Sequence, residues 1–248
     1  HRDFPIGQIR LLASARSAGK QMNVGGQLLT VEETTRDSFK DMDIAFISVN
    51  TELSGQLAPI AVKAGALVID DSSFYRMDEK VPLVVPEVNP EDVEWHSGII
   101  SIPNCSTTPL VVICSPLHKR NRITRIIADT YQSVSGAGSA AVKELQDQVT
   151  VISSGGVCQP EHIPHQIAFN VIPRIDVLKD DGYTKEEHKM INETRKILHN
   201  PEMRITSTCV RVPVPITHCE SINLELSDNL DLQSIYNALD SMTGINGL

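Results

Sequence analysis

The sequence lacks an apolar run of the roughly 18–20 residues that a membrane-spanning helix needs, so we predict no membrane role. It also lacks a basic excess: 31 Asp and Glu residues outnumber 22 Lys and Arg residues, for a formal net charge of −9. Polyanions bind clustered basic faces, so this balance disfavours nucleic acid and anionic membranes as partners. Repeats and low-complexity tracts are missing as well. The 248 residues, 41 % apolar and 21 % charged, are typical of a globular protein with two domains.

Cysteine is scarce, with five residues far apart in the chain. An odd number at such spacings argues against a disulfide scaffold and fits a reducing compartment, either a bacterial cytoplasm or a plastid stroma. No pair has the spacing of zinc ligands, so we predict no metal site. His218 and Cys219 are adjacent, but consecutive strand residues point to opposite faces, so these two side chains should diverge.

Residues 9–104 alternate short apolar runs with helical stretches. The predicted strands cover 9–13, 44–49, 66–69 and 99–102, and a predicted helix covers 57–65. Near-continuous β-branched strands spaced by helices indicate a parallel sheet that is covered on both faces. We therefore predict an α/β fold that begins with a doubly wound, dinucleotide-binding sheet.

From about Arg122 the pattern changes to long alternating strands with separate helices. Strands are predicted over 123–131, 204–214 and 221–226, and helices over 139–152, 184–198 and 231–242. The apolar face of the last helix comprises Leu232, Ile235, Leu239 and Met242. This second style indicates an α+β domain, and we place the two domains at 1–104 and 105–248.

The two ends of the chain lack expected features. The chain begins with His1, and residues 1–8 show neither a strand pattern nor a glycine loop. It stops at Leu248, just after the last predicted helix. We expect the chain to be an internal piece of a longer protein.

Cys105 is the strongest candidate for a reactive side chain. It follows an apolar strand over 98–102 and precedes a helix over 110–117, which a threonine at 107–108 would cap and Pro109 would open. The helix N-terminus favours thiolate over thiol, and ligands bind at the carboxyl ends of parallel strands. The alternative is a small buried hydrophobic residue, as most free cysteines are.

Two loops have the composition of ligand-binding segments. Ser135-Gly136-Ala137-Gly138 lies between a strand and a helix, where its N–H groups could hold an anion or a flat polar ring; a plain tight turn is the alternative. The segment from Ser14 to Lys20, which includes Arg16 and Ser17, could hold a phosphate monoester. An ordinary solvated loop would explain the same residues.

Four charged or titratable residues in the second half also have more than one explanation. Glu186 and Lys189 share a helix face, and most such pairs are solvated surface ion pairs. Arg211 lies in an otherwise apolar strand and must find an anion, either a protein carboxylate or a substrate. His218 on its own is an ordinary histidine at a strand end.

Together these motifs resemble the aspartate-semialdehyde dehydrogenase family over essentially the whole chain. The matching stretches, in the family's order, are Leu11–Lys20, Asp70–Ser73 with Arg76-Met77, Val81–Asn89, Pro103–Thr107, Tyr131-Gln132 with Ser135–Gly138, Phe169–Pro173, Glu186–Lys196, Arg211–Val214 and His218–Ser221. The ordered set is specific, whereas each motif alone is modest. The family's glycine-rich dinucleotide loop, expected before His1, and its C-terminal part, expected after Leu248, are not in this sequence.

The resemblance implies an NADPH-dependent oxidoreductase that converts L-aspartyl 4-phosphate to L-aspartate 4-semialdehyde and phosphate, in the biosynthesis of lysine, threonine, methionine and isoleucine. Cys105 would be the nucleophile that forms a thioacyl intermediate, His218 its acid–base partner, and Gln132 the group that positions the acyl carbonyl. The substrate-binding residues would be Arg211 for the α-carboxylate, Glu186 for the ammonium group, and Arg76, Asn104 and Lys189 for the phosphate. The NADP-binding residues would be Ser14, Arg16 and Ser17 at the 2′-phosphate, and Ser135 and Gly136 at the nicotinamide.

A homodimer formed by the second domain is also implied, and two alternative functions remain. N-acetylglutamyl-phosphate reductase has the same cysteine chemistry, but its substrate has no ammonium group for Glu186 to meet. A non-catalytic assembly domain is the other alternative, although decay of function should erase scattered catalytic positions first. A piece that lacks both ends could itself be inactive.

Overall fold

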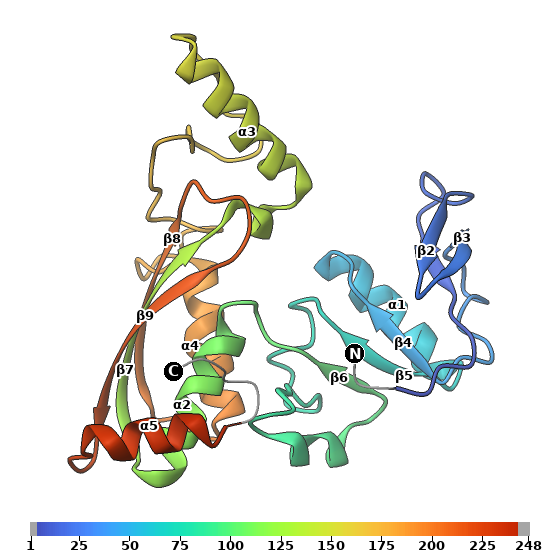
Figure 1. The fold of residues 1–248 in the computed structure, drawn as a ribbon. Coiled ribbons are helices and arrows are strands. Elements are labelled where there is room, and N and C mark those ends of the chain that lie inside the picture. Colours follow the sequence, from blue (N-terminus) through green and yellow to red (C-terminus); the bar gives the residue numbers. More distant parts are fainter. Residues whose placement is uncertain (1–3, 243–248) are drawn as a thin grey trace. The chain divides into compact units, whose positions relative to one another are not determined.

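The computed structural model describes residues 4–242, and its internal contacts divide the chain into two compact units, His1–Phe74 and Tyr75–Leu248. Figure 1 shows the elements of each unit along the sequence. The predicted domain boundary between Asn104 and Cys105 lies further along the chain than this division, and it stays a prediction. No helix within residues 4–242 is both long and apolar enough to cross a membrane.

The first unit opens with a small sheet of order β1-β3-β2. β1 (Leu11–Ala13) is parallel to β3 (Gln27–Glu33), and β2 (Gln21–Val24) is antiparallel to β3. The β2–β3 turn contains Gly25-Gly26, whose φ values of +58° and +86° suit a tight hairpin turn. Neither β2 nor β3 is among the predicted strands, although two glycines between short strands are a hairpin signal.

A βαβ unit follows, as predicted, with its two strands parallel. It consists of β4 (Ile44–Ile47), α1 (Thr51–Lys63) and β5 (Leu67–Asp70). Asn50 caps α1, because its side chain accepts a hydrogen bond of 2.9 Å from the N–H of Leu53. The helix predicted over 57–65 therefore begins too late, while Gly65, with φ of +98°, does mark its end.

The second unit is built on a three-stranded sheet of order β8-β7-β9. Its strands are β7 (Ile123–Gln132), β8 (Arg204–Arg211) and β9 (Cys219–Leu226). The central β7 is parallel to β8 and antiparallel to β9. The register places Gln132 opposite Arg211, so two predicted site residues lie side by side at one edge of the sheet.

Three helices pack on one face of this sheet: α2 (Thr107–Arg120), α4 (Lys185–Ile197) and α5 (Leu232–Asp240) (Figure 1). Their shared core includes Leu110, Cys114 and Leu117 of α2, Met190 of α4, Leu239 of α5, and Ile126 and Ala128 of β7. The alternate residues of β9 from Cys219 to Glu225 are exposed. The second unit is thus the α+β layer with one covered sheet face that the sequence predicts.

Two predicted boundaries near the site are wrong. β8 ends at Arg211 rather than at residue 214, because Pro213 and Pro215 have no N–H to donate to a sheet. The helix predicted from residue 110 begins at Thr107, with Ser106 as its N-cap residue and no side-chain cap bond. The threonines at 107–108 therefore lie inside the first turn and do not cap it.

The apolar face predicted for the last helix is also partly wrong. Asp231 caps α5 by accepting a hydrogen bond from the N–H of Ser234, and this places Leu232 at the first helical position. Leu232 is 63 % exposed, whereas Leu239 is buried in the core.

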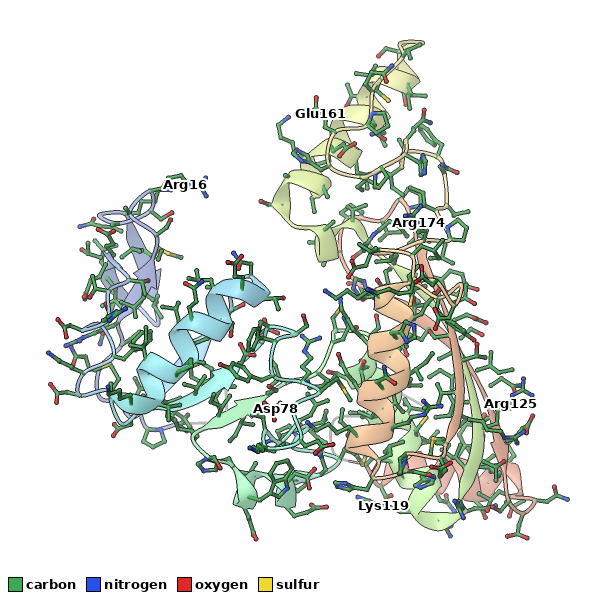
Figure 2. The ribbon with its side chains drawn as sticks, turned by 180° about the vertical axis from the view of Figure 1, so that it is seen from behind. Arg16, Asp78, Lys119, Arg125, Glu161 and Arg174 are labelled. Carbon is green, nitrogen blue, oxygen red and sulfur yellow. The ribbon has the colours of Figure 1, made fainter. Side chains whose placement is uncertain are left out.

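The remaining elements are η1 (Pro90–Trp95), β6 (Ile99–Ser101), η2 (Val134–Ala137) and α3 (Ser139–Ser153). α3 secures the loop that follows it. The Glu144 carboxylate accepts hydrogen bonds from the backbone N–H groups of Glu161, His162 and Ile163, and Figure 2 labels Glu161 in this loop. One buried carboxylate therefore holds three consecutive N–H groups of an irregular segment.

Candidate functional site

Cys105 lies in the short connection between β6 and α2, directly before Ser106. Its Sγ is 3.5 Å from Nε2 of His218, the residue that precedes β9. Cys105 is exposed to solvent, so the alternative of a small buried hydrophobic residue is wrong. The structure thus brings the predicted nucleophile within contact of its predicted acid–base partner.

The protonation of this pair differs from the sequence-based expectation. The surrounding protein raises the pKa of the Cys105 thiol by desolvation, and the Glu186 carboxylate adds to this; hydrogen bonds involving Ser106 offset only part of the effect. Burial lowers the pKa of His218, and the positive charge of Arg211 contributes. The backbone hydrogen bonds at the helix N-terminus do favour the thiolate, as the sequence predicts, but burial outweighs them. The proton on the sulfur has to be removed before the sulfur can attack.

Ser133, which was not among the predicted site residues, fixes the far side of the His218 ring. Its N–H lies 3.1 Å from Nδ1 and its hydroxyl oxygen lies 3.2 Å from the same atom. When the N–H donates to Nδ1, the ring proton is on Nε2 and faces the sulfur. When Nδ1 carries the proton and donates a hydrogen bond to the hydroxyl, Nε2 has a free lone pair and can accept the proton of the thiol. Ser133 can therefore form a hydrogen bond with Nδ1 in either neutral form of the His218 ring.

The backbone before His218 is strained. Thr217 has φ of +85°, a conformation that a β-branched residue rarely adopts. Such outliers persist where the surrounding structure holds them, and they cluster at functional sites. The strain here lies directly next to the ring that faces Cys105.

A buried polar network surrounds the sulfur. Oε1 of Glu186 accepts hydrogen bonds from Nδ2 of Asn104 at 3.0 Å and from Nε2 of Gln132 at 3.3 Å. Nε2 of Gln132 also donates to the hydroxyl of Ser106 at 2.5 Å, and Oδ1 of Asn104 accepts from the N–H of Ser106 at 2.9 Å. All four side chains are buried, so the network holds the residues on both sides of Cys105 in place.

Lys189 lies in a partly buried ion-pair cluster. Its Nζ is 2.9 Å from Oε2 of Glu186 and 3.1 Å from Oδ2 of Asp176, and 20 % of its side chain is exposed. The interpretation of Glu186 and Lys189 as a solvated surface ion pair is therefore wrong. Burial alone would lower the pKa of Lys189, but the two carboxylates raise it, so the ammonium group stays charged. Asp176, which the sequence analysis did not single out, has φ of +67°.

Arg76 lies in a second buried ion pair. Its Nη1 is 3.1 Å from Oε1 of Glu193, a residue of α4 that was not predicted. The side chains are 8 % and 2 % exposed, respectively. Each of the two predicted phosphate-binding cations therefore has a carboxylate partner on the same helix, α4.

Arg211 is a buried cation without a carboxylate partner in the part of the chain that the structure describes. Its residue is 8 % exposed, and its Nη1 donates to the carbonyl of Ser133 at 2.6 Å. A buried guanidinium has five N–H donors, so most of its hydrogen-bonding capacity remains for a bound anion. Glu186 acts on this guanidinium only by its charge and forms no ion pair with it, so a bound anion stays a prediction.

Gly136, in η2, lies over the same side chains. A Cβ at this position would be 3.2 Å from Nη1 of Arg211 and 3.7 Å from Nε2 of His218. A side chain at this position would therefore press on Arg211 and His218. The hydroxyl of the neighbouring Ser135 is 2.9 Å from that of Ser133, which connects η2 to the imidazole.

Ser14, Arg16 and Ser17 belong to the first unit, in the turn after β1. The N–H of Ser17 donates to the carbonyl of Ser14 at 2.8 Å, which closes the turn. Arg16 is exposed at this turn, as Figure 2 shows. Hydroxyl groups and an exposed guanidinium on one turn leave the predicted phosphate site a prediction.

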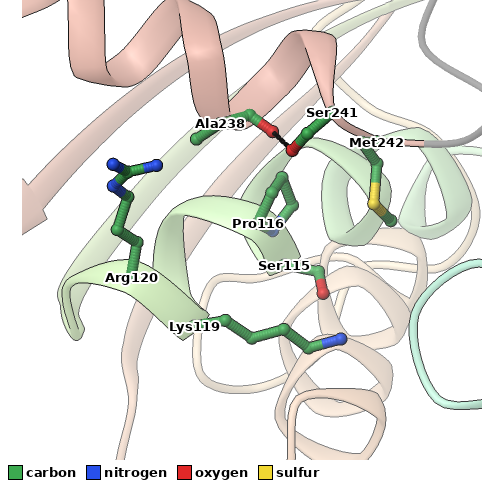
Figure 3. Close-up of a pocket in the computed structure, with 7 residues that line it drawn as sticks. All are labelled: Ser115, Pro116, Lys119, Arg120, Ala238, Ser241 and Met242. Atoms are coloured by element: carbon green, nitrogen blue, oxygen red, sulfur yellow. Dashed lines mark hydrogen bonds between the residues drawn. The ribbon is translucent and has the colours of Figure 1, made fainter.

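The described residues contain no cluster of three or more His, Cys, Asp or Glu side chains that could hold a metal ion. One cavity, of about 340 Å³, lies between α2 and α5 (Figure 3). Its lining residues are Ser115, Pro116, Lys119, Arg120, Ala238, Ser241 and Met242. None of these is a predicted site residue, so the cavity does not mark the Cys105 site.

Two family models match the chain. The model described as "Semialdehyde dehydrogenase, NAD binding domain" matches residues 1–96, and the one described as "Semialdehyde dehydrogenase, dimerisation domain" matches residues 114–245. The predicted fold class is confirmed. The fold and the cysteine–histidine site together define an oxidoreductase of the semialdehyde dehydrogenase class, with a domain for a nicotinamide dinucleotide.

Similar proteins narrow this class. The aspartate-semialdehyde dehydrogenase of Bacillus subtilis is 46 % identical over 252 residues, covering 98 % of this chain and 73 % of that protein. Aspartate semialdehyde dehydrogenase II of Vibrio cholerae, solved in complex with ASA, superposes with a TM-score of 0.96 at 42 % identity, covering 99 % of this chain and 74 % of that one. The Candida albicans enzyme, solved with NADP, has a TM-score of 0.70 at 26 % identity, covering 97 % and 70 %. This chain belongs to the aspartate-semialdehyde dehydrogenase family.

Proposed function

We propose that Cys105 is the nucleophile in the NADPH-dependent reductive dephosphorylation of L-aspartyl 4-phosphate to L-aspartate 4-semialdehyde. The observation that carries the proposal is the distance of 3.5 Å between its Sγ and Nε2 of His218. A positioned base next to a thiol is the arrangement that covalent catalysis needs.

The first step forms a thioester and releases phosphate. His218 takes the thiol proton, and the sulfur attacks the acyl carbon. The bond from that carbon to the phosphate oxygen breaks, and phosphate leaves with the proton. Lys189 and Arg76 stabilise its negative charge, because cations placed where charge develops lower the barrier. Gln132 orients the acyl carbonyl, and the Asn104 side chain binds the phosphate.

The second step reduces the thioester. NADPH supplies the hydride when it is bound. After phosphate has left, His218 takes up a proton from solvent and gives it to the sulfur, and the carbon–sulfur bond breaks to release the aldehyde and restore the thiol. His218 acts through Nε2 in both steps, so Nδ1 keeps its proton throughout, and the hydroxyl of Ser133 can accept a hydrogen bond from it.

The amino-acid head group of the substrate needs one cation and one anion. Arg211 binds the α-carboxylate. This assignment is supported by its buried guanidinium, which forms no ion pair with a carboxylate of the described residues. Glu186 binds the ammonium group. Its position in the network, beside Asn104 and Gln132, supports this assignment. The acylated nitrogen of N-acetylglutamyl phosphate would offer Glu186 no cation.

NADP is the proposed form of the cofactor. The turn with Ser14, Arg16 and Ser17 would hold the 2′-phosphate, and Ser135 with Gly136 would lie against the nicotinamide. The close approach of Gly136 to Arg211 and His218, which leaves little room for a side chain, supports the second assignment. The presence of NADP in the Candida albicans structure supports the choice of dinucleotide.

The second unit would form a homodimer, which the match to a dimerisation domain over 114–245 supports. The substrates would be small molecules, aspartyl phosphate and phosphate, as the ASA bound to the Vibrio cholerae enzyme supports. The similar bacterial enzymes favour a bacterial cytoplasm over a plastid stroma as the location.

The test is the Cys105→Ala variant of the complete enzyme, with Cys158→Ala as a matched control outside the site. Cys105→Ala should abolish turnover and leave NADPH binding nearly intact, whereas Cys158→Ala should retain turnover. Assays with aspartate semialdehyde and N-acetylglutamate semialdehyde, each with phosphate, should show activity with the first. Unchanged turnover of Cys105→Ala would overturn the proposal.

A further inference from the structure

Glu193 is a buried carboxylate in contact with two residues of the site. It lies on α4, and 1 % of the residue is exposed. Oε1 is 3.1 Å from Nη1 of Arg76, and Oε2 accepts a hydrogen bond of 2.7 Å from the backbone N–H of Asn104. Its two oxygens therefore join a cation to the backbone directly before Cys105.

This position requires a group that only accepts hydrogen bonds. The guanidinium of Arg76 and the N–H of Asn104 are both donors, one on each oxygen, and a carboxylate satisfies both. A glutamine of the same shape would turn an NH₂ group toward either Arg76 or Asn104. One buried donor would then face another donor and lose its partner, which is costly in a buried site. Burial raises the pKa of Glu193, while Arg76 and the Asn104 N–H favour its charged form.

The same face of α4 also holds the backbone of Arg76. Nζ of Lys196, three residues after Glu193, donates to the carbonyl of Arg76 at 2.7 Å and to those of Asp78 and Val81 at 2.8 Å. α4 thus fixes Arg76 at both ends, through its guanidinium and through its backbone. Glu186 and Lys189 lie on the same helix, so one rigid element carries or holds both phosphate-binding cations.

We propose that Glu193 is a positioning residue for the phosphate half of the reaction: it orients the Arg76 guanidinium and fixes Asn104, so that both meet the phosphate group. This inference rests on the proposed function, because it assigns Arg76 and Asn104 to the phosphate. Glu193 acts through Arg76 and Asn104 and is not assigned a contact with substrate or cofactor.

The experiment measures the reaction of aspartate semialdehyde, NADP and phosphate in the complete enzyme. Glu193→Gln should raise the KM for phosphate by about tenfold or more, the loss expected when one charge-assisted hydrogen bond is broken. The KM for the semialdehyde should change by less than about threefold, because Arg211 and Glu186 keep their contacts. Glu193→Asp keeps both acceptors and should recover part of the phosphate affinity.

Glu187→Gln is the matched control. Glu187 is also a buried glutamate of α4 that accepts two backbone hydrogen bonds, from Thr184 at 2.6 Å and from Cys209 at 3.0 Å. Neither partner is a phosphate-binding residue. Glu187→Gln should therefore lower thermal stability, as Glu193→Gln does, and leave the ratio of the two KM values unchanged.

The outcomes separate this inference from the proposed function. If Cys105→Ala retains turnover, the proposed function fails. If Cys105→Ala is inactive but Glu193→Gln changes the two KM values in parallel, as a general loss of stability would, the role of Glu193 is overturned and the proposed function stands. An unchanged or lower KM for phosphate in Glu193→Gln would overturn it as well.

Discussion

Ser133 contacts His218 through two different atoms, a backbone N–H at 3.1 Å and a hydroxyl oxygen at 3.2 Å from Nδ1. The carbonyl of Ser133 accepts a hydrogen bond of 2.6 Å from Arg211. One fully buried serine therefore connects the ring that handles the proton with the cation proposed to bind the substrate.

Ser133→Ala should lower kcat by about tenfold. Of the two Ser133 groups that lie at Nδ1, only the hydroxyl can accept a hydrogen bond from the protonated ring nitrogen, and the substitution removes it. The backbone N–H and carbonyl remain, so the KM for the semialdehyde should change little. Steady-state kinetics with both substrates varied would measure this. A wild-type kcat in Ser133→Ala would show that the hydroxyl has no part in the proton transfer.

Alkylation of Cys105 by iodoacetamide should depend on pH in a defined direction. The surrounding protein and Glu186 raise the pKa of the thiol above its ordinary 9.0, so the thiolate fraction and the rate should still rise above pH 9. Glu186→Gln removes the negative charge and should move the profile to lower pH, whereas Glu187→Gln should not. A rate that is already level near about pH 7 would contradict the raised pKa.

Arg211→Lys should raise the KM for aspartate semialdehyde by about 10- to 100-fold, because an ammonium group cannot reproduce the planar fork of a guanidinium at a buried carboxylate site. NADP affinity and the melting temperature should change little. Arg125→Lys is a suitable control, since Arg125 pairs with Glu225 on the exposed part of the sheet. Equal KM values in Arg211→Lys and the wild type would exclude Arg211 as the carboxylate-binding residue.

Glu144→Gln should destabilise the protein by about 1–3 kcal/mol, because a glutamine cannot accept the hydrogen bonds of all three N–H groups. Burial alone would raise the pKa of Glu144, but the bonds from Glu161, His162 and Ile163 lower it below the ordinary 4.5. Its stabilisation is therefore present above pH 4.5 and is lost as the pH falls through the lower folded value. Denaturant unfolding at several pH values, with the exposed Glu161→Gln as control, would measure both effects.

Local sequence signals predicted most of the fold. The apolar runs of β4, β5 and β7 and the helices α3 and α4 are regular enough to be identified one by one. The β2–β3 hairpin was missed, since it is short and its strands are mostly exposed, so that only Gly25-Gly26 marks it. Boundaries failed where a capping residue such as Asn50, or a proline such as Pro213, overrides the apolar pattern.

The site was predicted less evenly. Cys105 could be singled out by its place between a strand and a helix, but the partners of Cys105 and of the predicted cations come from far away in the chain. Arg76 and Glu193 are separated by 117 positions, and Cys105 and His218 by 113. No local pattern connects such residues, so Ser133, Asp176 and Glu193 could not be found from the sequence. The raised pKa of Cys105 also depends on this packing, which outweighs the helix N-terminus.

The most direct test of the account is to trap the thioester. Enzyme mixed with aspartate semialdehyde and NADP, without phosphate, should form NADPH in a burst of one equivalent per active site. The thioester then accumulates, because no phosphate is present to accept its acyl group. Mass spectrometry of the quenched protein should find one aspartyl group on the peptide that contains Cys105, and hydroxylamine should remove it. Absence of a burst, or an acyl group on any other residue, would contradict the assignment of Cys105 as the nucleophile.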